Sequence, residues 1–209
     1  MTEIALQPSH RGIEESEIVA ALGARAIVLV GMMGAGKSTI GRRLATRLHL
    51  PFRDADIEIE AAHAGMTIPE IFATHGEPYF RDGEARVIAR LLSGGASVLA
   101  TGGGAFQREE TRQRVRDNAV SIWLSADADT ILRRVKRRSD RPLLQTADPA
   151  ATIERLIAER SPNYQLADIT IASREVPHEK IVDECIAALH GWLRPDASSG
   201  HPLQQDQSP

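Results

Sequence analysis

The chain has 209 residues, a net charge of −3 and 42% hydrophobic residues, which is typical of one globular domain and not of a disordered or fibrous protein. The slightly acidic balance argues against a general nucleic-acid binder, and no apolar run is long enough to span a membrane. Residues 1–17 lack the basic flank and apolar segment of a secretory signal, so we expect a cytoplasmic protein. The single cysteine, Cys185, excludes an internal disulfide and is predicted to be a small buried residue of a late helix.

The two ends of the chain are predicted to be extensions of one domain that covers residues 25–193. Residues 1–24 are polar with a weak amphipathic stretch, which predicts a short helix or a disordered segment. Residues 194–209 are rich in Pro, Ser, Gln and Asp and contain too few apolar side chains to offset the cost of ordering. We therefore expect a disordered C-terminal tail.

Short apolar runs alternate with helical patterns between these ends. The runs predict strands at Ala26–Val30, Pro51–Asp54, Ala96–Ala100, Val120–Leu124 and Ile169–Ala172. Helical patterns are found at 37–48, 76–92, 108–116, 127–137, 149–160 and 178–192, and a capping-box spacing at 67–70 predicts a further helix start. Strands separated by helices predict an α/β fold, with a five-stranded parallel sheet and helices on both faces.

A phosphate-binding loop follows the first predicted strand directly. Residues 31–39 (GMMGAGKST) satisfy G-x-x-x-x-G-K-[ST] between a strand and a helix, where glycines allow backbone N–H groups to gather around phosphate oxygens. Lys37 is expected to bind the β- and γ-phosphates, and the Ser38 hydroxyl to ligate Mg²⁺. The motif predicts a nucleoside triphosphate and fits ATP and GTP alike. The expected nucleotide-binding residues are Gly34, Ala35, Gly36, Lys37, Ser38 and Thr39.

Two carboxylates, Asp54 and Asp56, end the second predicted strand. Ligands of doubly wound sheets bind at the carboxyl ends of the strands. These side chains can divide the work, with Asp54 near Mg²⁺ and Asp56 accepting a proton or hydrogen bond from an attacking hydroxyl. The alternative for an isolated D-x-D pair is a solvated turn or a helix cap.

Four further motifs are each weak alone. Residues 76–84 (GEPYFRDGE) place Arg81 in a helix, and residues 101–104 (TGGG) allow a ligand to approach the backbone closely, unless they form a plain flexible turn. Residues 133–144 (RRVKRRSDRPLL) are either an exposed basic face, a nucleic-acid patch or arginines that close over phosphates. Residues 159–164 (ERSPNY) end a helix with Arg160, which can pair bidentately with a carboxylate.

In this order and spacing, the motifs resemble the shikimate kinase family over residues 26–190. The resemblance implies a P-loop fold related to nucleoside monophosphate kinases, with a lid at about 138–149. It also implies transfer of the ATP γ-phosphoryl group to the 3-hydroxyl of shikimate, with Mg²⁺, in aromatic amino-acid biosynthesis.

The resemblance also implies roles for individual residues. Lys37 resembles the phosphate-binding lysine, and Ser38 and Asp54 resemble the Mg²⁺ site. Arg141 resembles a catalytic lid arginine that reaches ATP, and Arg134 a residue that packs against adenine. The residues that resemble the shikimate site are Asp56, Arg81, Gly103, Gly104 and Arg160, with Asp56 facing the hydroxyls and both arginines facing the carboxylate.

Two other functions remain open on the sequence alone. One is a kinase for a nucleotide or for another sugar acid such as gluconate, and the other is a nucleotide-regulated binding protein without catalysis. The TGGG and ERSPNY motifs favour shikimate, and every expected catalytic position is filled. We expect shikimate as the partner, no nucleic acid or membrane partner, and a monomer.

Overall fold

A parallel five-stranded sheet forms the centre of the molecule, as predicted. The computed structural model describes residues 10–136 and 148–194. The strand order is β2-β3-β1-β4-β5, so the strand that precedes the phosphate loop lies in the middle. The strands are β1 (Ala26–Val30), β2 (Phe52–Asp54), β3 (Val98–Ala100), β4 (Ala119–Ser125) and β5 (Ile169–Ala172).

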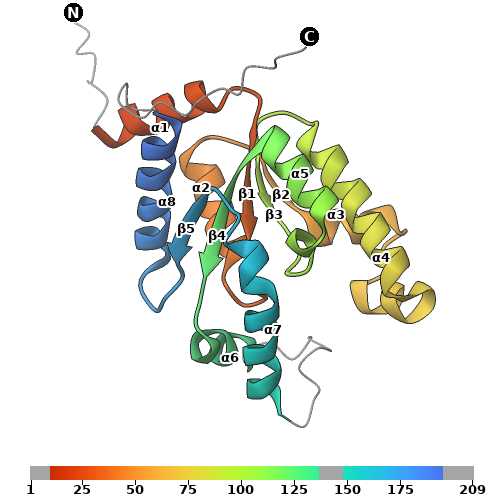
Figure 1. Ribbon diagram of the computed structural model, residues 1–209. Helices are drawn as coiled ribbons and strands as arrows, with labels where there is room; N and C mark the ends of the chain where they lie inside the picture. Colours follow the sequence, from red (N-terminus) through yellow and green to blue (C-terminus); the bar gives the residue numbers. More distant parts are fainter. Residues whose placement is uncertain (1–9, 137–147, 195–209) are drawn as a thin grey trace, which may run out of the picture.

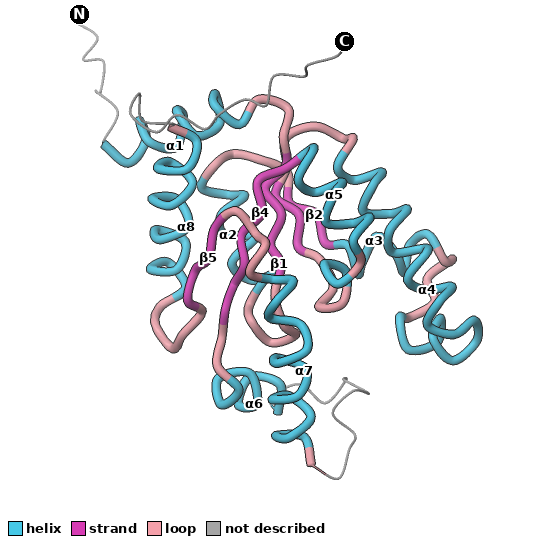
Figure 2. Tube along the Cα trace, in the orientation of Figure 1, coloured by secondary structure: helices cyan, strands magenta, loops and turns pink. Residues whose placement is uncertain are grey.

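Helices cover both faces of this sheet (Figures 1 and 2). In the described ranges they are α1 (His10–Leu22), α2 (Lys37–Arg47), α3 (Ala55–Ala62), α4 (Ile68–Leu92), the 3-10 helix η1 (Ala105–Gln107), α5 (Glu109–Asn118), α6 (Ala128–Lys136), α7 (Pro149–Tyr164) and α8 (His178–Leu193). The sequence did not predict α3, and α7 extends beyond the predicted end at residue 160, through Pro162 to Tyr164. None of the helices in the described part of the chain is long and apolar enough to cross a membrane.

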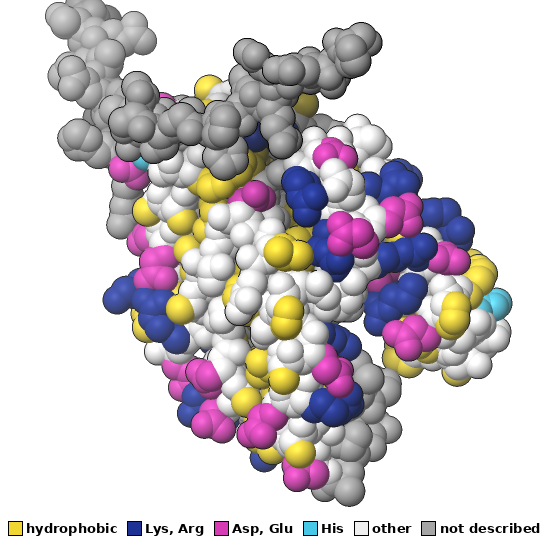
Figure 3. Space-filling view, in the orientation of Figure 1, with side chains coloured by type: hydrophobic (Ala, Val, Ile, Leu, Met, Phe, Trp, Pro, Cys, Tyr) yellow, Lys and Arg dark blue, Asp and Glu magenta, His cyan; other side chains and the backbone are white. Residues whose placement is uncertain are grey.

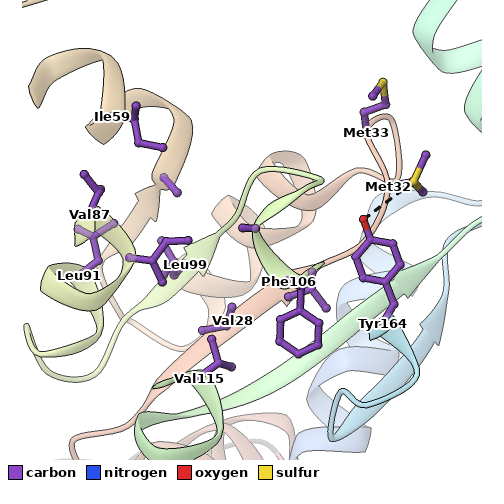
Figure 4. Close-up of a cluster of buried hydrophobic side chains, with 14 of the residues drawn as sticks. Val28, Met32, Met33, Ile59, Val87, Leu91, Leu99, Phe106, Val115 and Tyr164 are labelled. Carbon is purple, nitrogen blue, oxygen red and sulfur yellow. Dashed lines mark hydrogen bonds between the residues drawn. The ribbon is translucent and has the colours of Figure 1, made fainter. Parts of the chain in front are cut away.

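The strand β1 separates two hydrophobic cores. All five of its residues are buried, as expected for a central strand with a helical layer on each side. Val28 and Val30 contribute to the core beneath α3, α4, α5 and α7, part of which Figure 4 shows. Ile27 and Leu29 point to the other core, beneath α1, α2 and α8. Successive side chains of β1 thus pack into the two cores in turn, which fixes the strand from both faces. The phosphate loop begins at the end of this strand.

The helix α4 begins and bends where its sequence requires. The Thr67 side chain accepts a hydrogen bond from the Glu70 backbone while the Glu70 carboxylate accepts one from the Thr67 backbone, so the predicted capping box is present. The backbone leaves helical geometry at Gly76, whose φ of 80° suits glycine best, and Pro78 follows. The second half of α4 brings Arg81 and Glu84 to the edge of the sheet where the site lies.

The N-terminal helix α1 packs against α8 at the opposite edge of the sheet (Figure 1). Ile18 and Leu22 are buried there. Arg47, at the end of α2, joins α1 to α8 through ion pairs with Glu15 at 2.6 Å and Asp183 at 3.0 Å. Residues 10–22 therefore belong to the packed body of the protein.

Candidate active site

The phosphate loop connects β1 to α2 through glycines in conformations that other residues avoid. Gly34 has a φ of 77° and Gly36 a φ of 97°. Space is also restricted, because a Cβ at Gly34 would lie 2.8 Å from the Val135 side chain and one at Gly31 would lie 2.6 Å from the Leu124 carbonyl oxygen. Only glycine fits these positions without a shift of the neighbouring chain.

Lys37 lies buried at the first turn of α2. Its Nζ donates to the carbonyl oxygens of Gly31 at 2.8 Å and Met32 at 2.9 Å, so the ammonium group sits within the curve of the loop. Gly36 occupies the N-cap position of α2 and leaves the N–H groups of the first turn facing the loop. A helix N-terminus with a buried lysine beside it forms a strong anion site.

Ser38 and Asp54 meet beside this loop. The Ser38 hydroxyl donates to Asp54 Oδ2 at 2.7 Å. The other carboxylate oxygen, Oδ1, accepts from the Asp56 backbone N–H at 3.2 Å, so Asp54 also caps α3. Asp54 therefore caps α3 and also lies beside the phosphate loop through its contact with Ser38.

Two carboxylates, those of Asp56 and Glu84, flank Gly102 just after the end of β3. A Cβ at Gly102 would lie 2.9 Å from Asp56 Oδ1 and 2.8 Å from Glu84 Oε1. Burial raises the pKa of Glu84 and the negative charge of Asp56 raises it further, while the Arg81 guanidinium opposes both effects. The absence of a side chain at Gly102 thus leaves room for two acidic groups beside it, of which Asp56 lines the cavity.

Arg81 lies over the glycine loop. Its Nη1 donates to Glu84 Oε2 at 2.7 Å and its Nε donates to Glu77 Oε1 at 3.2 Å. A Cβ at Gly104 would overlap the guanidinium, so the arginine can take this position only above glycine. No role was predicted for Glu84, although its position three residues after Arg81 on a helix was a usable signal.

Arg160 reaches the same loop from the opposite side. Its Nη1 donates to the Gly103 carbonyl oxygen at 3.3 Å, and the Gly103 backbone lies close enough to the phosphate loop that a Cβ there would be 3.2 Å from the Met33 nitrogen. Arg81 and Arg160 therefore flank Gly103 and Gly104 next to the phosphate loop. The structure brings together the predicted acceptor-side residues.

A cavity of about 380 Å³ runs along the phosphate loop. Arg134 of α6 closes one wall, with Nη1 donating to Ser173 Oγ at 2.8 Å and to the Gly34 carbonyl at 3.3 Å. Sequence reasoning missed the residues that follow β5 and line this wall. They are Ser173, Arg174, His178 and Ile181. No motif marks them, and the only signal was the place of β5 in the sheet.

The surface is hollowed between the first part of α4 and the α7 region, and Lys and Arg side chains gather along the edge of this hollow (Figure 3). In the basic run, Arg134 turns into the cavity while Arg133 pairs with Glu175 at 3.3 Å. Arg141 lies outside the described residues, as does the predicted lid except for Asp148 and Pro149, which begin α7.

The comparisons with known proteins agree with this geometry. The family model described as shikimate kinase matches residues 33–190. A shikimate kinase from Rhodopseudomonas palustris is 75% identical over 183 residues, covering 88% of this chain and 90% of that one. A shikimate kinase from Nitrobacter winogradskyi is 71% identical over 194 residues, covering 92% and 90%.

Solved structures show the same relationship. A shikimate kinase from Acinetobacter baumannii, solved in complex with shikimate, has 36% identity and a TM-score of 0.75 over 83% of this chain and 94% of that one. A gluconokinase from Sinorhizobium meliloti, at 17% identity and a TM-score of 0.53 over 79% and 91%, shares the fold alone. With its phosphate loop, its glycine loop flanked by arginines and its match to the family over most of its length, this chain belongs to the shikimate kinase family, the ATP-dependent phosphotransferases.

Proposed function

We propose that this chain transfers the γ-phosphoryl group of ATP to the 3-hydroxyl of shikimate, giving shikimate 3-phosphate and ADP. One observation carries the proposal: Arg81 and Arg160 flank a glycine loop beside the phosphate loop, with Asp56 at the same cleft. The two guanidinium groups can bind a carboxylate of the acceptor, and the Asp56 carboxylate can accept a hydrogen bond from a hydroxyl group of the acceptor. Shikimate carries both groups.

On the donor side, Lys37 and the first turn of α2 neutralise the phosphate charge. Phosphoryl transfer has a loose transition state, so positioning and charge stabilisation carry most of the catalysis. Arg134 also lines the cavity, and it is proposed to pack against the adenine. Arg141 is proposed from the sequence to reach ATP from the lid, and its replacement by alanine would test that role.

The Mg²⁺ of the reaction is proposed to bind at Ser38 and Asp54. The pair fits this ion, because a hydroxyl and a carboxylate 2.7 Å apart beside the phosphate loop are hard oxygen ligands. Mg²⁺ usually takes only one or two protein ligands and completes its shell with water and phosphate oxygens. An ion held by Ser38 and Asp54 would supply positive charge beside the phosphates, where negative charge develops during the transfer.

On the acceptor side, Asp56 is proposed to orient the attacking hydroxyl and accept its proton. General-base assistance of this kind contributes about 10²–10⁴-fold to the rate. Glu84 holds Arg81 in place through the 2.7 Å ion pair, so that the guanidinium faces the loop and not solvent. Arg160 completes the carboxylate site from α7.

The activity is tested by measuring ADP release with MgATP and a panel of acceptors. The panel contains shikimate, gluconate, nucleoside monophosphates and water. We expect rapid turnover with shikimate and little with the others. Preferred turnover of gluconate or of a nucleoside monophosphate would assign a different kinase activity, and ADP release without any acceptor would indicate an ATPase.

We also propose that the protein acts as a monomer in the cytoplasm, where ATP is available. The proposal comes from the sequence, which carries in one chain every residue expected of the donor side and of the acceptor side. Sedimentation at several protein concentrations, with and without substrates, tests the monomer. A stable dimer under assay conditions would contradict it.

A further inference from the structure

Tyr164, the last residue of α7, lies where two loops of the site meet. It is 1% exposed, and it follows Arg160 by one helical turn. Its hydroxyl donates to the Gly103 carbonyl oxygen and lies 3.9 Å from the sulfur of Met32 in the phosphate loop (Figure 4). A single hydroxyl therefore contacts both the glycine loop and the phosphate loop.

The Gly103 carbonyl oxygen receives two hydrogen bonds from α7. One comes from the Tyr164 hydroxyl and the other, at 3.3 Å, from Arg160 Nη1. The Gly103–Gly104 peptide is trans, so its C=O and the Gly104 N–H point in opposite directions. Holding the carbonyl toward α7 therefore directs the Gly104 N–H away from α7. A peptide between two glycines can rotate more easily than one between other residues, because glycine has no side chain to restrict φ and ψ. The hydrogen bonds from α7 therefore hold this peptide in one orientation.

The tyrosine ring is itself firmly held. It stacks on Trp123 of β4, with the ring centroids 5.9 Å apart and an interplanar angle of 27°. Burial raises the pKa of Tyr164 to about 12, and the positive charge of Arg160 opposes this shift. The phenol therefore keeps its proton at neutral pH and remains a hydrogen-bond donor.

We propose that Tyr164 is a positioning residue for the acceptor: its hydroxyl fixes the Gly103–Gly104 peptide and thereby the place of Arg160 beside it. If the hydroxyl is lost, the Gly103 oxygen keeps Arg160 as its nearest donor from α7, and the guanidinium is drawn toward the loop. Both the peptide and the arginine then leave the arrangement in which they meet a carboxylate. This inference rests on the proposed function.

The test is Tyr164→Phe, which removes the hydroxyl and keeps the ring on Trp123. We expect the KM for shikimate to rise by about 2- to 12-fold, the size of one neutral hydrogen bond. The KM for ATP should stay within about twofold, because the contact with the Met32 sulfur is long and weak. Calorimetric titration with shikimate at low temperature measures the same effect if the variant is too unstable for assay.

Two control variants separate positioning from general stability. Asn163→Ala removes a 2.7 Å hydrogen bond from Asn163 Nδ2 to Gln107 Oε1 at the same junction of α7 and η1, without touching Gly103. It should lower the melting midpoint and leave the KM for shikimate unchanged. Tyr79→Phe makes the same chemical change at an exposed tyrosine of α4 and should alter neither quantity.

Three results would overturn the inference. They are an unchanged KM for shikimate in Tyr164→Phe, an equal rise in both KM values, and a rise in Asn163→Ala as large as that in Tyr164→Phe. Failure of the proposed function has a different signature, since the wild-type protein would then release no ADP with shikimate. The wild-type assay is therefore made first.

Discussion

At the scale of single residues, the position of Arg160 depends on the glycine loop that it faces. A cation near the end of a helix can simply interact with the last carbonyl groups of that helix, a contribution of about 0.3–1 kcal/mol. The Arg160 guanidinium instead donates to Gly103, 57 residues away in sequence. This contact places a planar, forked donor beside the cleft, where a carboxylate can accept two parallel hydrogen bonds.

We therefore predict that Arg160→Lys weakens shikimate binding by about 10- to 150-fold, because it keeps the charge and loses the fork. ATP affinity should barely change, since Arg160 is proposed to belong to the acceptor side of the site. Separate calorimetric titrations with shikimate and with ATP measure both effects. Arg155→Lys is a matched control, because Arg155 is exposed on the same helix and its guanidinium forms an ion pair with Glu159 on the helix surface. Intact shikimate affinity in Arg160→Lys would remove this residue from the site.

Cys185 offers a second prediction at this scale. The thiol is buried in α8, and burial raises its pKa from the ordinary value of 9.0 to about 12, with the charge of Glu184 adding to the shift. Below pH 9 the thiol is protonated in both the folded and the unfolded state, so its ionisation takes nothing from the free energy of unfolding. Above pH 9 the unfolded chain loses this proton first, and stability falls until the pH reaches the folded pKa.

The free energy of unfolding should therefore decrease between pH 9 and 12 by about 1.4 kcal/mol per pH unit from this group. Urea unfolding of the wild-type protein and of Cys185→Ala, at a series of pH values, measures the difference in slope. Tyr164 adds a decrease of the same sign between pH 10 and about 12 in both proteins. Equal slopes in the two proteins would show that the thiol ionises normally in the folded state.

At the scale of elements, α1 is part of the packed structure. Its buried Ile18 lies in the same core as residues of α2 and α8. Arg47 links all three helices, and α2 begins at the phosphate loop. The helix α1 lies near the end of the sheet where β1 begins, away from the phosphate loop (Figure 1). We therefore expect α1 to contribute to stability and not to catalysis.

Ile18→Ala is expected to lower the free energy of unfolding by about 2–5 kcal/mol, the usual cost of truncating a buried aliphatic side chain. The control is Ile57→Ala, which deletes the same atoms from a side chain 55% exposed in α3 and should cost less than about 0.5 kcal/mol. Chemical denaturation gives both values. The kcat of Ile18→Ala, assayed well below its melting midpoint, should equal that of the wild type. A similar cost for the two variants would mean that α1 is not docked in solution.

At the scale of the whole molecule, the proposed donor side and the proposed acceptor side meet next to the phosphate loop. The donor side uses the phosphate loop, α6 and the residues after β5, while the acceptor side uses α3, α4, the glycine loop and α7. A ligand that binds only the folded protein stabilises it, by about 2.7 kcal/mol at a concentration of about 100 times its dissociation constant.

We predict that MgATP and shikimate each raise the melting midpoint by about 5–10 °C at such concentrations, as expected for a chain of this size. Lys37→Ala should lose the shift with MgATP and most of its turnover, yet keep the shift with shikimate, because Lys37 contacts the phosphate loop. Differential scanning fluorimetry with each ligand checks this. A loss of both shifts in Lys37→Ala would mean that the substitution disrupts the fold and not one half of the site.

The sequence alone determined the features that local physics controls. The β1 strand, the phosphate loop and the start of α4 each depend on neighbouring residues, such as the apolar run Ala26–Val30 or the capping box at Thr67. The order of strands and helices then restricted the fold to a parallel sheet. The helix α3 was missed because it has only eight residues and because Asp54 and Asp56, its N-cap and a residue of its first turn, also suit a solvated turn.

Only the tertiary structure decided which side chains meet. Glu84 joins Asp56 at Gly102, Arg134 meets Ser173, and Tyr164 anchors Gly103, although each pair is far apart along the chain. Such contacts depend on the order of the strands and the bend of α4, and no local pattern encodes them. Motifs could therefore identify which residue types carry the chemistry, while the relative positions of donor and acceptor groups required the packed sheet, because proximity in space is set by the whole core.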